Sequence, residues 1–301
     1  MSDARAARIA AVAYPYEKRT HEAVDECNLC GSSRFVEVAR RDRYGFPALF
    51  QLCATCGLGF LSPRLTAAEY AEFYAAVYRP LVSAYHGREI NAETVQEEQR
   101  VYARELVEFL RTALPDAPAT VLDVGGSTGI VAGAVRDAFG SAATILDPAP
   151  DELAHAAAAG METVAGFAEE AELGDRMFDL VLLCQTIDHL LDIASTLRSI
   201  RAWVAPGGSV FVDVLDVEFM ALRRGSIEGA VKIDHPFSLT RETALAFFQQ
   251  AGLSPTAERL SDDGHLGFLL APAEPAEPDW AELARAACEL RRRIWHLRAP
   301  G

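Results

Sequence analysis

The 301-residue sequence lacks any long run of apolar side chains, and this absence limits the classes of protein that it can encode. No run approaches the roughly 18 residues that a transmembrane helix needs. The start of the chain, MSDARAARIAAVAYPYEKR, also lacks the continuous apolar segment of a signal peptide. We therefore expect a soluble, cytoplasmic protein without a membrane anchor.

The sequence is also short of positive charge. It contains 28 Lys and Arg against 43 Asp and Glu, which gives a formal net charge of −15. Nucleic-acid binding depends on clustered Lys and Arg, and anionic membranes also attract basic surfaces. We therefore expect neither nucleic acid nor membrane as a partner. A small anionic molecule remains possible, because a local basic pocket can form in an acidic protein.

Two common nucleotide-binding motifs and internal repeats are missing. The dinucleotide fingerprint GxGxxG fits no register, and the P-loop motif GxxxxGK[ST] is absent, which argues against NAD and against ATP bound by a P-loop. With 50% hydrophobic and 24% charged residues, the composition is typical of a globular protein. The length fits one large domain with one or two small modules.

Cysteine is scarce, but four of the six cysteines form two CxxCG motifs. In a reducing compartment this spacing favours a tetrahedral zinc site over disulfides, whereas four unrelated thiols are the alternative. Four protein ligands leave no open coordination position, so the zinc ion would be structural. The expected ligands are Cys27, Cys30, Cys53 and Cys56. Cys184 and Cys288 are expected to be packing residues.

After residue 118 the sequence alternates between apolar strands and amphipathic helices. This alternation predicts parallel βαβ units and an α/β, doubly wound sheet. An Asp-Gly pair between two apolar runs, at 263–264, predicts a hairpin and an antiparallel last strand. We divide the chain into an N-terminal segment with the cysteine module (1–62), a helical linker region (63–118), the sheet domain (119–272), and a linker with a C-terminal helix (273–301).

Two local patterns precede the sheet domain. Residues 1–20 have mixed charge and no clear apolar stripe, which predicts a mobile or loosely packed start. The run Thr66-Ala67-Ala68-Glu69 predicts a capping box, in which the Thr66 hydroxyl and the Glu69 carboxylate satisfy backbone N–H groups at a helix start.

A glycine-rich turn follows the first strand of the sheet domain. Gly125, Gly126, Ser127 and Gly129 lie between the strand at 120–124 and the next helix. Such a turn lets a ligand approach backbone N–H groups closely, although glycines there can also be purely structural. Asp147 ends the next strand, where an acid typically binds ribose hydroxyls. Together these features predict a cofactor that contains a nucleoside.

The segment Asp123–Gly129 resembles motif I of the class I S-adenosylmethionine-dependent methyltransferases. Asp147 matches their ribose-binding acid, Phe178-Asp179-Leu180-Val181 resembles their fourth strand, and Ala-Pro-Gly-Gly at 205–208 resembles the turn before their fifth. With the CxxCG motifs, the chain resembles bacterial methyltransferases that carry an N-terminal zinc-binding module, many of which act on nucleotide sugars or other small metabolites. Ser127 departs from the pattern, because the commonest motif has its middle glycine there.

The resemblance implies a Rossmann-like, seven-stranded sheet and S-adenosylmethionine as the cofactor. The acid and glycines of motif I would hold the methionine portion, the acid after the second strand would hold the ribose, and the segment after the third strand would lie near the adenine. The implied cofactor contacts are Asp123, Gly125, Gly126, Ser127, Gly129, Asp147, Phe167, Ala168 and Gln185.

Methyl transfer to a hydroxyl or a carbon acid needs a base, and two histidines are candidates. His235 follows the fifth strand in a segment that resembles the base-bearing stretch of sugar C-methyltransferases, and His189 follows the fourth strand. His235 could instead cap a helix, and His189 could shape the cofactor pocket. The remaining histidines, at 21, 86, 155, 265 and 296, are expected to be surface or packing residues.

Basic and aromatic side chains near His235 could bind the substrate. Four of them could hold a phosphate or carboxylate, or could belong to a solvated surface. These are Arg223, Arg224, Lys232 and Arg241. Tyr78, in a Tyr-Arg-Pro segment, and Tyr85 could line the substrate entrance or pack in the core.

We therefore expect an enzyme that methylates a small molecule, with nucleotide sugars as the leading class. Oxygen, nitrogen and carbon acceptors all fit these residues. A protein methyltransferase whose zinc module recognises a macromolecule is one alternative, and a non-catalytic S-adenosylmethionine-binding module is another. The sequence implies no particular oligomeric state.

Overall fold

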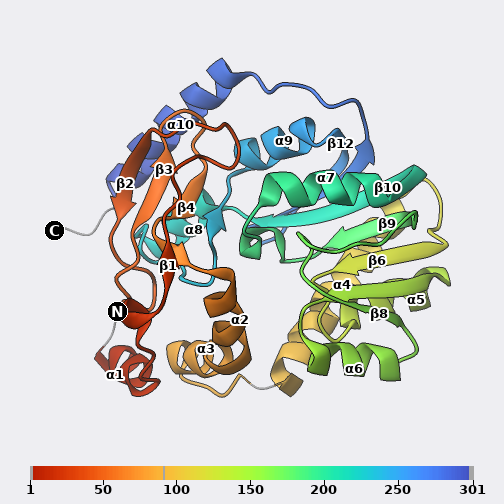
Figure 1. Cartoon of the computed structure of the whole chain (residues 1–301), viewed down its shortest axis with the longest axis horizontal. Coiled ribbons are helices and arrows are strands. Elements are labelled where there is room, and N and C mark those ends of the chain that lie inside the picture. The colour runs from red at the N-terminus through yellow and green to blue at the C-terminus, as the bar shows by residue number, and fades with distance from the viewer. Residues whose placement is uncertain (1–2, 91, 298–301) are drawn as a thin grey trace. The chain divides into compact units, whose positions relative to one another are not determined.

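The computed structural model describes residues 3–90 and 92–297, which gather into two compact units (Figure 1). The first unit is drawn from the segments Met1–Val95, Asp216–Thr243 and Asp279–Gly301. The second is drawn from Gln96–Leu215 and Ala244–Pro278. Neither unit is one continuous stretch of chain, so each is described below by its own elements.

The second unit contains a seven-stranded sheet in the order β12-β13-β10-β9-β6-β7-β8. Five neighbouring strands are parallel, whereas β13 runs antiparallel to both β10 and β12. The predicted doubly wound sheet with an antiparallel last strand is therefore confirmed. The strands are β6 (Thr120–Val124), β7 (Ala142–Asp147), β8 (Glu162–Ala165), β9 (Phe178–Leu183), β10 (Val204–Leu215), β12 (Leu253–Leu260) and β13 (His265–Pro272).

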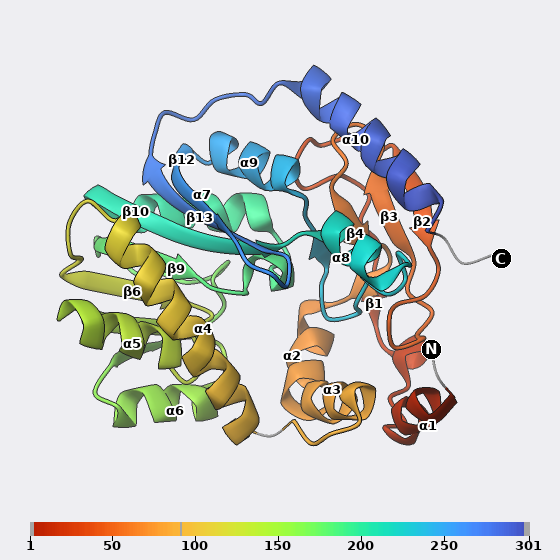
Figure 2. The same ribbon diagram turned by 180° about the vertical axis from the view of Figure 1, so that it is seen from behind.

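Helices cover both faces of this sheet. One face packs on α4 (Ala92–Ala113), α5 (Ile130–Phe139) and α6 (Pro150–Ala158), whose apolar side chains form buried clusters with the strands (Figure 2). The opposite face carries α7 (Ile193–Trp203), as Figure 1 shows. A 3-10 turn, η2 (Ile187–His189), follows β9, and α9 (Arg241–Gln250) leads into β12. The apolar runs of the central strands β6, β9 and β10 are buried, as parallel sheets require, whereas the edge strands β8 and β12 are partly exposed.

Strand order reverses between β6 and β9, and this reversal positions the candidate site. Parallel strands end at the same edge of a sheet, and ligands of open α/β sheets bind outside those carboxyl ends at such a switch point. Asp123 and Asp147 lie at the ends of β6 and β7, Gln185 follows β9, and Asp213 lies near the end of β10.

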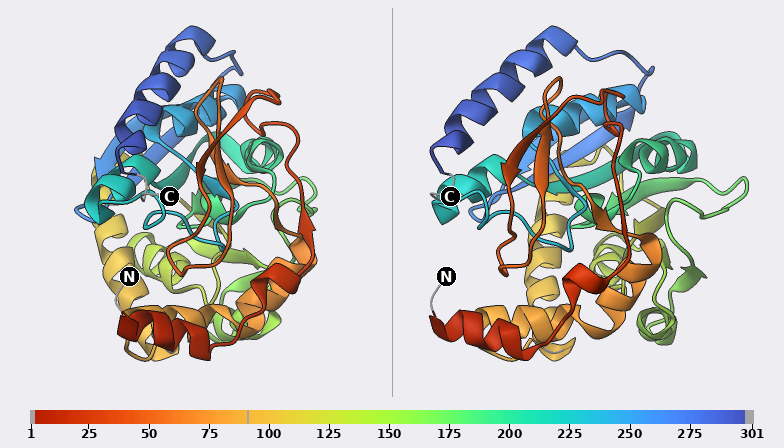
Figure 3. Two further views of the ribbon diagram at one scale, coloured as in Figure 1. Left: turned by 90° about the vertical axis from the view of Figure 1, so that its left-hand side faces the viewer. Right: turned by 60° about the vertical axis from the view of Figure 1, so that its left-hand side comes forward.

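The first unit is built on an antiparallel sheet of four strands, brought forward in Figure 3. Its strands are β11 (Phe237–Ser238), β4 (Gly59–Leu61), β3 (Phe50–Cys53) and β2 (Phe35–Ala39), in that order. The edge strand β11 comes from a segment far along the chain and pairs Phe237 with Phe60. A separate pair joins β1 (His21–Glu22) to β5 (Arg64–Leu65). The cysteine module is therefore completed by chain that follows most of the second unit.

The helices of the first unit are α1 (Asp3–Ala11), η1 (Tyr16–Lys18), α2 (Ala67–Ala76), α3 (Tyr78–His86), α8 (Val217–Arg224) and α10 (Trp280–Trp295). The expectation of a loosely packed start is wrong. Ile9 and Tyr16 are buried, and the Tyr14 ring packs edge-on against Phe46. Aromatic side chains from distant segments pack against this part of the chain and order it. A helical pattern of apolar residues cannot predict such contacts.

The predicted capping box is also wrong. Thr66 is the N-cap residue of α2, but its side chain makes no capping hydrogen bond. The Glu69 carboxylate instead accepts the backbone N–H of Thr20 at 3.0 Å and pairs with Arg19. The Glu69 carboxylate is therefore bound by Thr20 and Arg19, and not by the backbone at the start of its own helix. Within residues 3–90 and 92–297, no helix is both long enough and apolar enough to cross a membrane.

Candidate functional site

The turn between β6 and α5 holds its backbone in conformations that favour glycine. Gly125 and Gly129 have positive φ angles of 73° and 75°. A Cβ on Gly125 would lie 2.7 Å from both Cγ2 and Oγ1 of Thr186, which follows β9. Glycine at this position therefore brings the turn directly against the end of the neighbouring strand.

Asp123 lies beneath this turn and is almost completely buried, with 1% of its surface exposed. Its Oδ2 has no hydrogen-bond partner among the described residues. Burial, together with the nearby carboxylates of Asp147 and Asp213, raises the pKa of Asp123 to about 7, and a backbone hydrogen bond from Ala132 acts in the opposite direction. A Cβ on Gly126 would lie 2.7 Å from Asp123 Cγ, so a glycine also covers the carboxyl. A buried oxygen without a donor is the arrangement that a cationic or hydrogen-bonding ligand would complete.

Ser127 and Asp147 are joined at the same edge. The Ser127 N–H donates to Asp147 Oδ2 at 2.9 Å, and the Ala149 N–H donates to Oδ1 at 2.9 Å. Ser127 has a φ of 50°, an uncommon value for a residue with a side chain. Its hydroxyl also donates to Glu152 at 3.1 Å. The serine that departs from the family pattern is thus held in a glycine-like conformation by two carboxylates.

Gln185 also has a positive φ, 51°, and is held by a residue that sequence reasoning missed. Its N–H donates to Asp213 Oδ1 at 2.5 Å, and the Tyr102 hydroxyl donates to Asp213 Oδ2 at 2.7 Å. Asp213 is 1% exposed. The available signal was a lone acid inside the apolar strand 210–215, because a buried carboxylate needs partners. Strained residues held in this way are common at functional sites.

His265, expected to be a surface or packing residue, lies beside this network. It opens β13 opposite Leu215, and its Nδ1 is 3.7 Å from Asp213 Oδ2. Burial alone would lower the pKa of His265, but Asp213, Asp263 and Asp188 together raise it. His265 therefore retains its proton to higher pH than an ordinary histidine.

The residues expected near the adenine follow β8 in the second unit. Phe167 is 41% exposed, whereas Ala168 is buried. The Gly166 N–H donates to the carbonyl of Asp147 at 3.1 Å. This segment is thereby attached to the end of β7, next to the acid expected to bind ribose.

The two candidate bases belong to different units. His189, in the second unit, ends η2, and its Nε2 is 3.9 Å from Asp188 Oδ1. In the first unit, His235 Nε2 lies 2.8 Å from Lys232 Nζ and 3.5 Å from Asp234 Oδ2. Each imidazole therefore lies near the carboxylate of the residue that precedes it.

The expected substrate-binding residues all belong to the first unit. Tyr78 begins α3, and its ring packs against Tyr74 at 5.5 Å. Arg223 and Arg224 end α8, and Arg241 begins α9. Of these residues, Arg224 donates to the hydroxyl of Tyr85 at 3.1 Å.

The four paired cysteines come together in the first unit. Their sulfur atoms all lie within 4.8 Å of one another, and the Cys27–Cys56 and Cys30–Cys53 pairs are 3.5 Å apart. Four sulfurs at 2.3 Å from one zinc ion, placed tetrahedrally, would be about 3.8 Å apart. The donor set and its spacing therefore fit a tetrahedral, sulfur-ligated ion.

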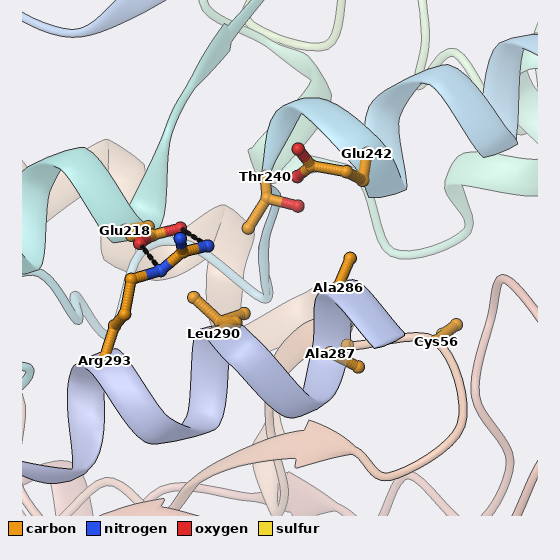
Figure 4. Close-up of a pocket in the computed structure, with 9 residues that line it drawn as sticks. Cys56, Glu218, Thr240, Glu242, Ala286, Ala287, Leu290 and Arg293 are labelled. Carbon is orange, nitrogen blue, oxygen red and sulfur yellow. Dashed lines mark hydrogen bonds and ion pairs between the residues drawn. The ribbon is translucent and has the colours of Figure 1, made fainter. Parts of the chain in front are cut away.

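Helix α10 packs beside this cluster. A Cβ on Gly57, which follows Cys56, would lie 3.0 Å from Ala287 Cβ. A small pocket opens between the cysteine loop and α10, and Figure 4 shows its lining. At one end of the pocket, Arg293 of α10 donates to Glu218 of α8 at 3.2 Å. The C-terminal helix therefore packs closely against the cysteine loop at Gly57 and is joined by charge to α8.

The second unit thus has the fold and edge chemistry of a protein that binds a nucleoside-containing cofactor: a doubly wound sheet, a glycine turn, and acids at two strand ends. Comparison with known proteins identifies the family to which this fold belongs. A family model described as a methyltransferase domain matches residues 95–258. The chain belongs to this family, and the resemblance to class I S-adenosylmethionine-dependent methyltransferases is confirmed.

Curated relatives are similar over part of the chain. The ubiquinone biosynthesis O-methyltransferase of Methylobacterium nodulans is 35% identical over 113 residues, which covers 35% of this chain and 45% of the relative. The protein with the same name from another Methylobacterium strain is 31% identical over 112 residues, covering 34% and 43%. The match spans less than half the length of either relative.

Solved structures share the fold at low sequence identity. Mitomycin 7-O-methyltransferase MmcR has a TM-score of 0.52 at 18% identity, over 68% of this chain and 60% of that chain. A protein of Pyrococcus horikoshii has a TM-score of 0.51 at 17% identity, over 58% and 92% of the two chains. These similarities establish the shared architecture of the sheet.

Proposed function

We propose that this protein transfers a methyl group from S-adenosylmethionine to a hydroxyl oxygen of a small molecule. The observation that carries the proposal is the buried Asp123 carboxyl, whose Oδ2 has no partner in the described chain and which is covered by a glycine turn at the switch point. Family membership identifies the ligand class that would fill this place. The names of the curated relatives and of the mitomycin enzyme support oxygen as the acceptor atom.

When bound, S-adenosylmethionine supplies a methyl group already activated by its sulfonium. Asp123 and the turn of Gly125, Gly126 and Gly129 would hold the methionine portion. Asp147 keeps acceptor capacity for ribose hydroxyls beyond the two N–H groups that it binds, because a carboxylate offers about four lone-pair sites. Alignment of the acceptor with the methyl carbon is then the main task of the protein.

A histidine would take the proton from the acceptor hydroxyl, and His189 and His235 are the candidates. Each should be replaced by Asn, with exposed His155 on α6 as the matched control. Loss of the base should lower kcat by about 100-fold or more, whereas His155→Asn should leave it unchanged. The candidate whose replacement removes the pH dependence of kcat would be the base. Unchanged rates in both variants would exclude a histidine base.

The substrate class is tested by a methyl-transfer assay read by mass spectrometry. The acceptor panel combines nucleotide sugars, the leading class, with ubiquinone precursors that carry ring hydroxyls. A product one methyl group heavier identifies the class. Absence of product with both classes, in protein that binds S-adenosylmethionine, would favour a protein acceptor. Absence of cofactor binding would refute the proposal itself.

We propose zinc as the ion of the four-cysteine cluster, in a structural role. Purified protein should contain one zinc per chain, and Cys53→Ser should lose it. Cys288→Ser, on α10 and outside the cluster, is the control that should retain it. Structural zinc contributes about 10–16 kcal/mol to the folding of small modules, so a chelator should unfold the first unit. Metal-free protein with an unchanged melting temperature would refute this role.

A further inference from the structure

Three arginines surround one buried tyrosine in the first unit. Tyr85 of α3 is 5% exposed. The guanidinium carbon of Arg43 lies 4.1 Å from the centre of its ring, and that of Arg5 lies 4.5 Å away. Arg224 donates to the Tyr85 hydroxyl at 3.1 Å. These cations come from α1, from the loop after β2 and from the end of α8, so the fold gathers them from distant parts of the sequence.

No carboxylate of a described residue forms an ion pair with these cations. Other arginines of the unit do form such pairs, such as Arg64 with Glu22. The Nε atoms of Arg5 and Arg43 are buried and have no hydrogen-bond acceptor in the described part of the chain. Buried N–H donors normally have a hydrogen-bond acceptor, so two such groups without one, both beside Tyr85, indicate a place where a ligand could supply the acceptor. The chain carries a net charge of −15, which makes an uncompensated basic cluster more distinctive.

Asp42, the acidic residue next to Arg43 in the sequence, does not provide a negative charge that pairs with the arginines. Asp42 precedes Arg43, but its Oδ1 accepts the N–H groups of Tyr44 and Phe46, both at 2.9 Å. Burial, together with the carboxylate of Asp234, raises the pKa of Asp42 to about 8, although backbone N–H groups act to lower it. Both oxygens of the Asp42 carboxyl thus accept backbone N–H groups, and among the described residues it forms no ion pair with Arg43. The loop itself is fixed, since the Arg43 N–H donates to the carbonyl of Val231 at 2.9 Å.

Guanidinium groups are suited to oxyanions, because their planar forks donate two parallel hydrogen bonds to phosphate or carboxylate oxygens. Three such groups match a ligand with several negative charges better than a single carboxylate. We propose that Arg5, Arg43 and Arg224 form a binding site for the diphosphate group of a small molecule. The Tyr85 ring and hydroxyl position the three cations.

The identity of the ligand rests in part on the proposed function, since a nucleotide-sugar acceptor carries a diphosphate. The site itself depends only on residues of the first unit. Binding can therefore be tested with inorganic pyrophosphate in the absence of S-adenosylmethionine, so that failure of one proposal does not imply failure of the other.

The test is calorimetric titration of the full-length protein with pyrophosphate, UDP and citrate. Arg5→Gln and Arg224→Gln should each weaken pyrophosphate binding about tenfold or more, the effect of losing a charge-assisted hydrogen bond. Arg111→Gln, on α4, is the control for charge; it removes an exposed arginine that pairs with Glu108 at 3.2 Å and should change nothing. Tyr85→Phe keeps the ring but loses the hydroxyl, and should weaken binding by a smaller factor.

Several outcomes would overturn the proposal. These are absence of saturable pyrophosphate binding by the wild-type protein, equal weakening by Arg111→Gln, and citrate binding as tight as that of pyrophosphate. UDP binding at least as tight as pyrophosphate supports a nucleotide-bearing ligand, whereas exclusion of UDP would refute the link to nucleotide sugars. S-adenosylmethionine should bind both arginine variants as it binds the wild type, which also shows that they are folded.

Discussion

The two glycines that follow the CxxC pairs provide a matched pair of substitutions. Both have left-handed backbones, with φ of 67° at Gly31 and 84° at Gly57. A Cβ on Gly31 would have no neighbour within 4 Å. A Cβ on Gly57 would lie 3.0 Å from Cβ and 3.2 Å from Cα of Ala287 on α10. Replacement by alanine therefore imposes the same backbone strain at both sites but crowds only one.

The expected costs follow from these contacts. A left-handed conformation costs an L-residue about 1–2 kcal/mol, which is the whole effect expected for Gly31→Ala. Overpacking against a backbone atom, which cannot rotate away, adds about 1–3 kcal/mol at Gly57. Gly57→Ala should therefore lower the free energy of unfolding by about 1–3 kcal/mol more than Gly31→Ala.

Urea denaturation of zinc-saturated protein measures this difference by tryptophan fluorescence, to which Trp280 and Trp295 at the two ends of α10 contribute together with Trp203 of α7. Adding Ala287→Gly to Gly57→Ala removes the closest contact, so the pair should show a coupling energy of at least about 0.5 kcal/mol. Equal costs for the two alanine substitutions, within about 0.5 kcal/mol, would refute the contact between the cysteine loop and α10.

Three further predictions concern the second unit. The pKa of Asp123 is raised to about 7, so below that pH its carboxyl is protonated and a cationic cofactor loses its charged partner. The affinity for S-adenosylmethionine should therefore fall about tenfold per pH unit below 7. Asp123→Asn should abolish this pH dependence in calorimetric titrations. Tyr102→Phe removes a donor from the buried Asp213 carboxylate and should cost about 1–3 kcal/mol in urea denaturation; a loss below about 0.5 kcal/mol would contradict this. Gly125→Ala, whose Cβ would lie 2.7 Å from Thr186, should weaken cofactor binding at least tenfold, and adding Thr186→Ala should restore part of it.

Features with a local cause were predictable from the sequence. Apolar runs such as 178–183 and turn residues such as the Asp-Gly pair at 263–264 predicted the sheet, the hairpin and the class of fold, which the structure and the family match confirm. Glycines and acids at strand ends marked the candidate cofactor site, because close backbone approach and ribose binding constrain residue type at those positions.

Features that depend on distant contacts were not predictable. Asp213 binds Tyr102, which lies 111 residues earlier, and no short pattern encodes that pairing. Glu69 has a suitable local partner at a helix start but bonds the distant Thr20 instead. The basic cluster around Tyr85 combines residues that are separated by much of the chain. In each case a tertiary partner, invisible to local propensity, determines the geometry.

The assembly of the first unit from three segments has a consequence for folding during synthesis. The ribosome releases the cysteine motifs early, but β11 at Phe237–Ser238 follows Leu61 of β4 only after most of the second unit has been made. At about 5–20 residues per second, this interval lasts roughly 10 to 35 seconds. During that time β4 has no β11 to pair with, so one of its edges is exposed. Exposed strand edges of this kind promote aggregation. An early-bound metal ion would hold the nascent module closed, so zinc supply during translation should affect the yield of folded protein.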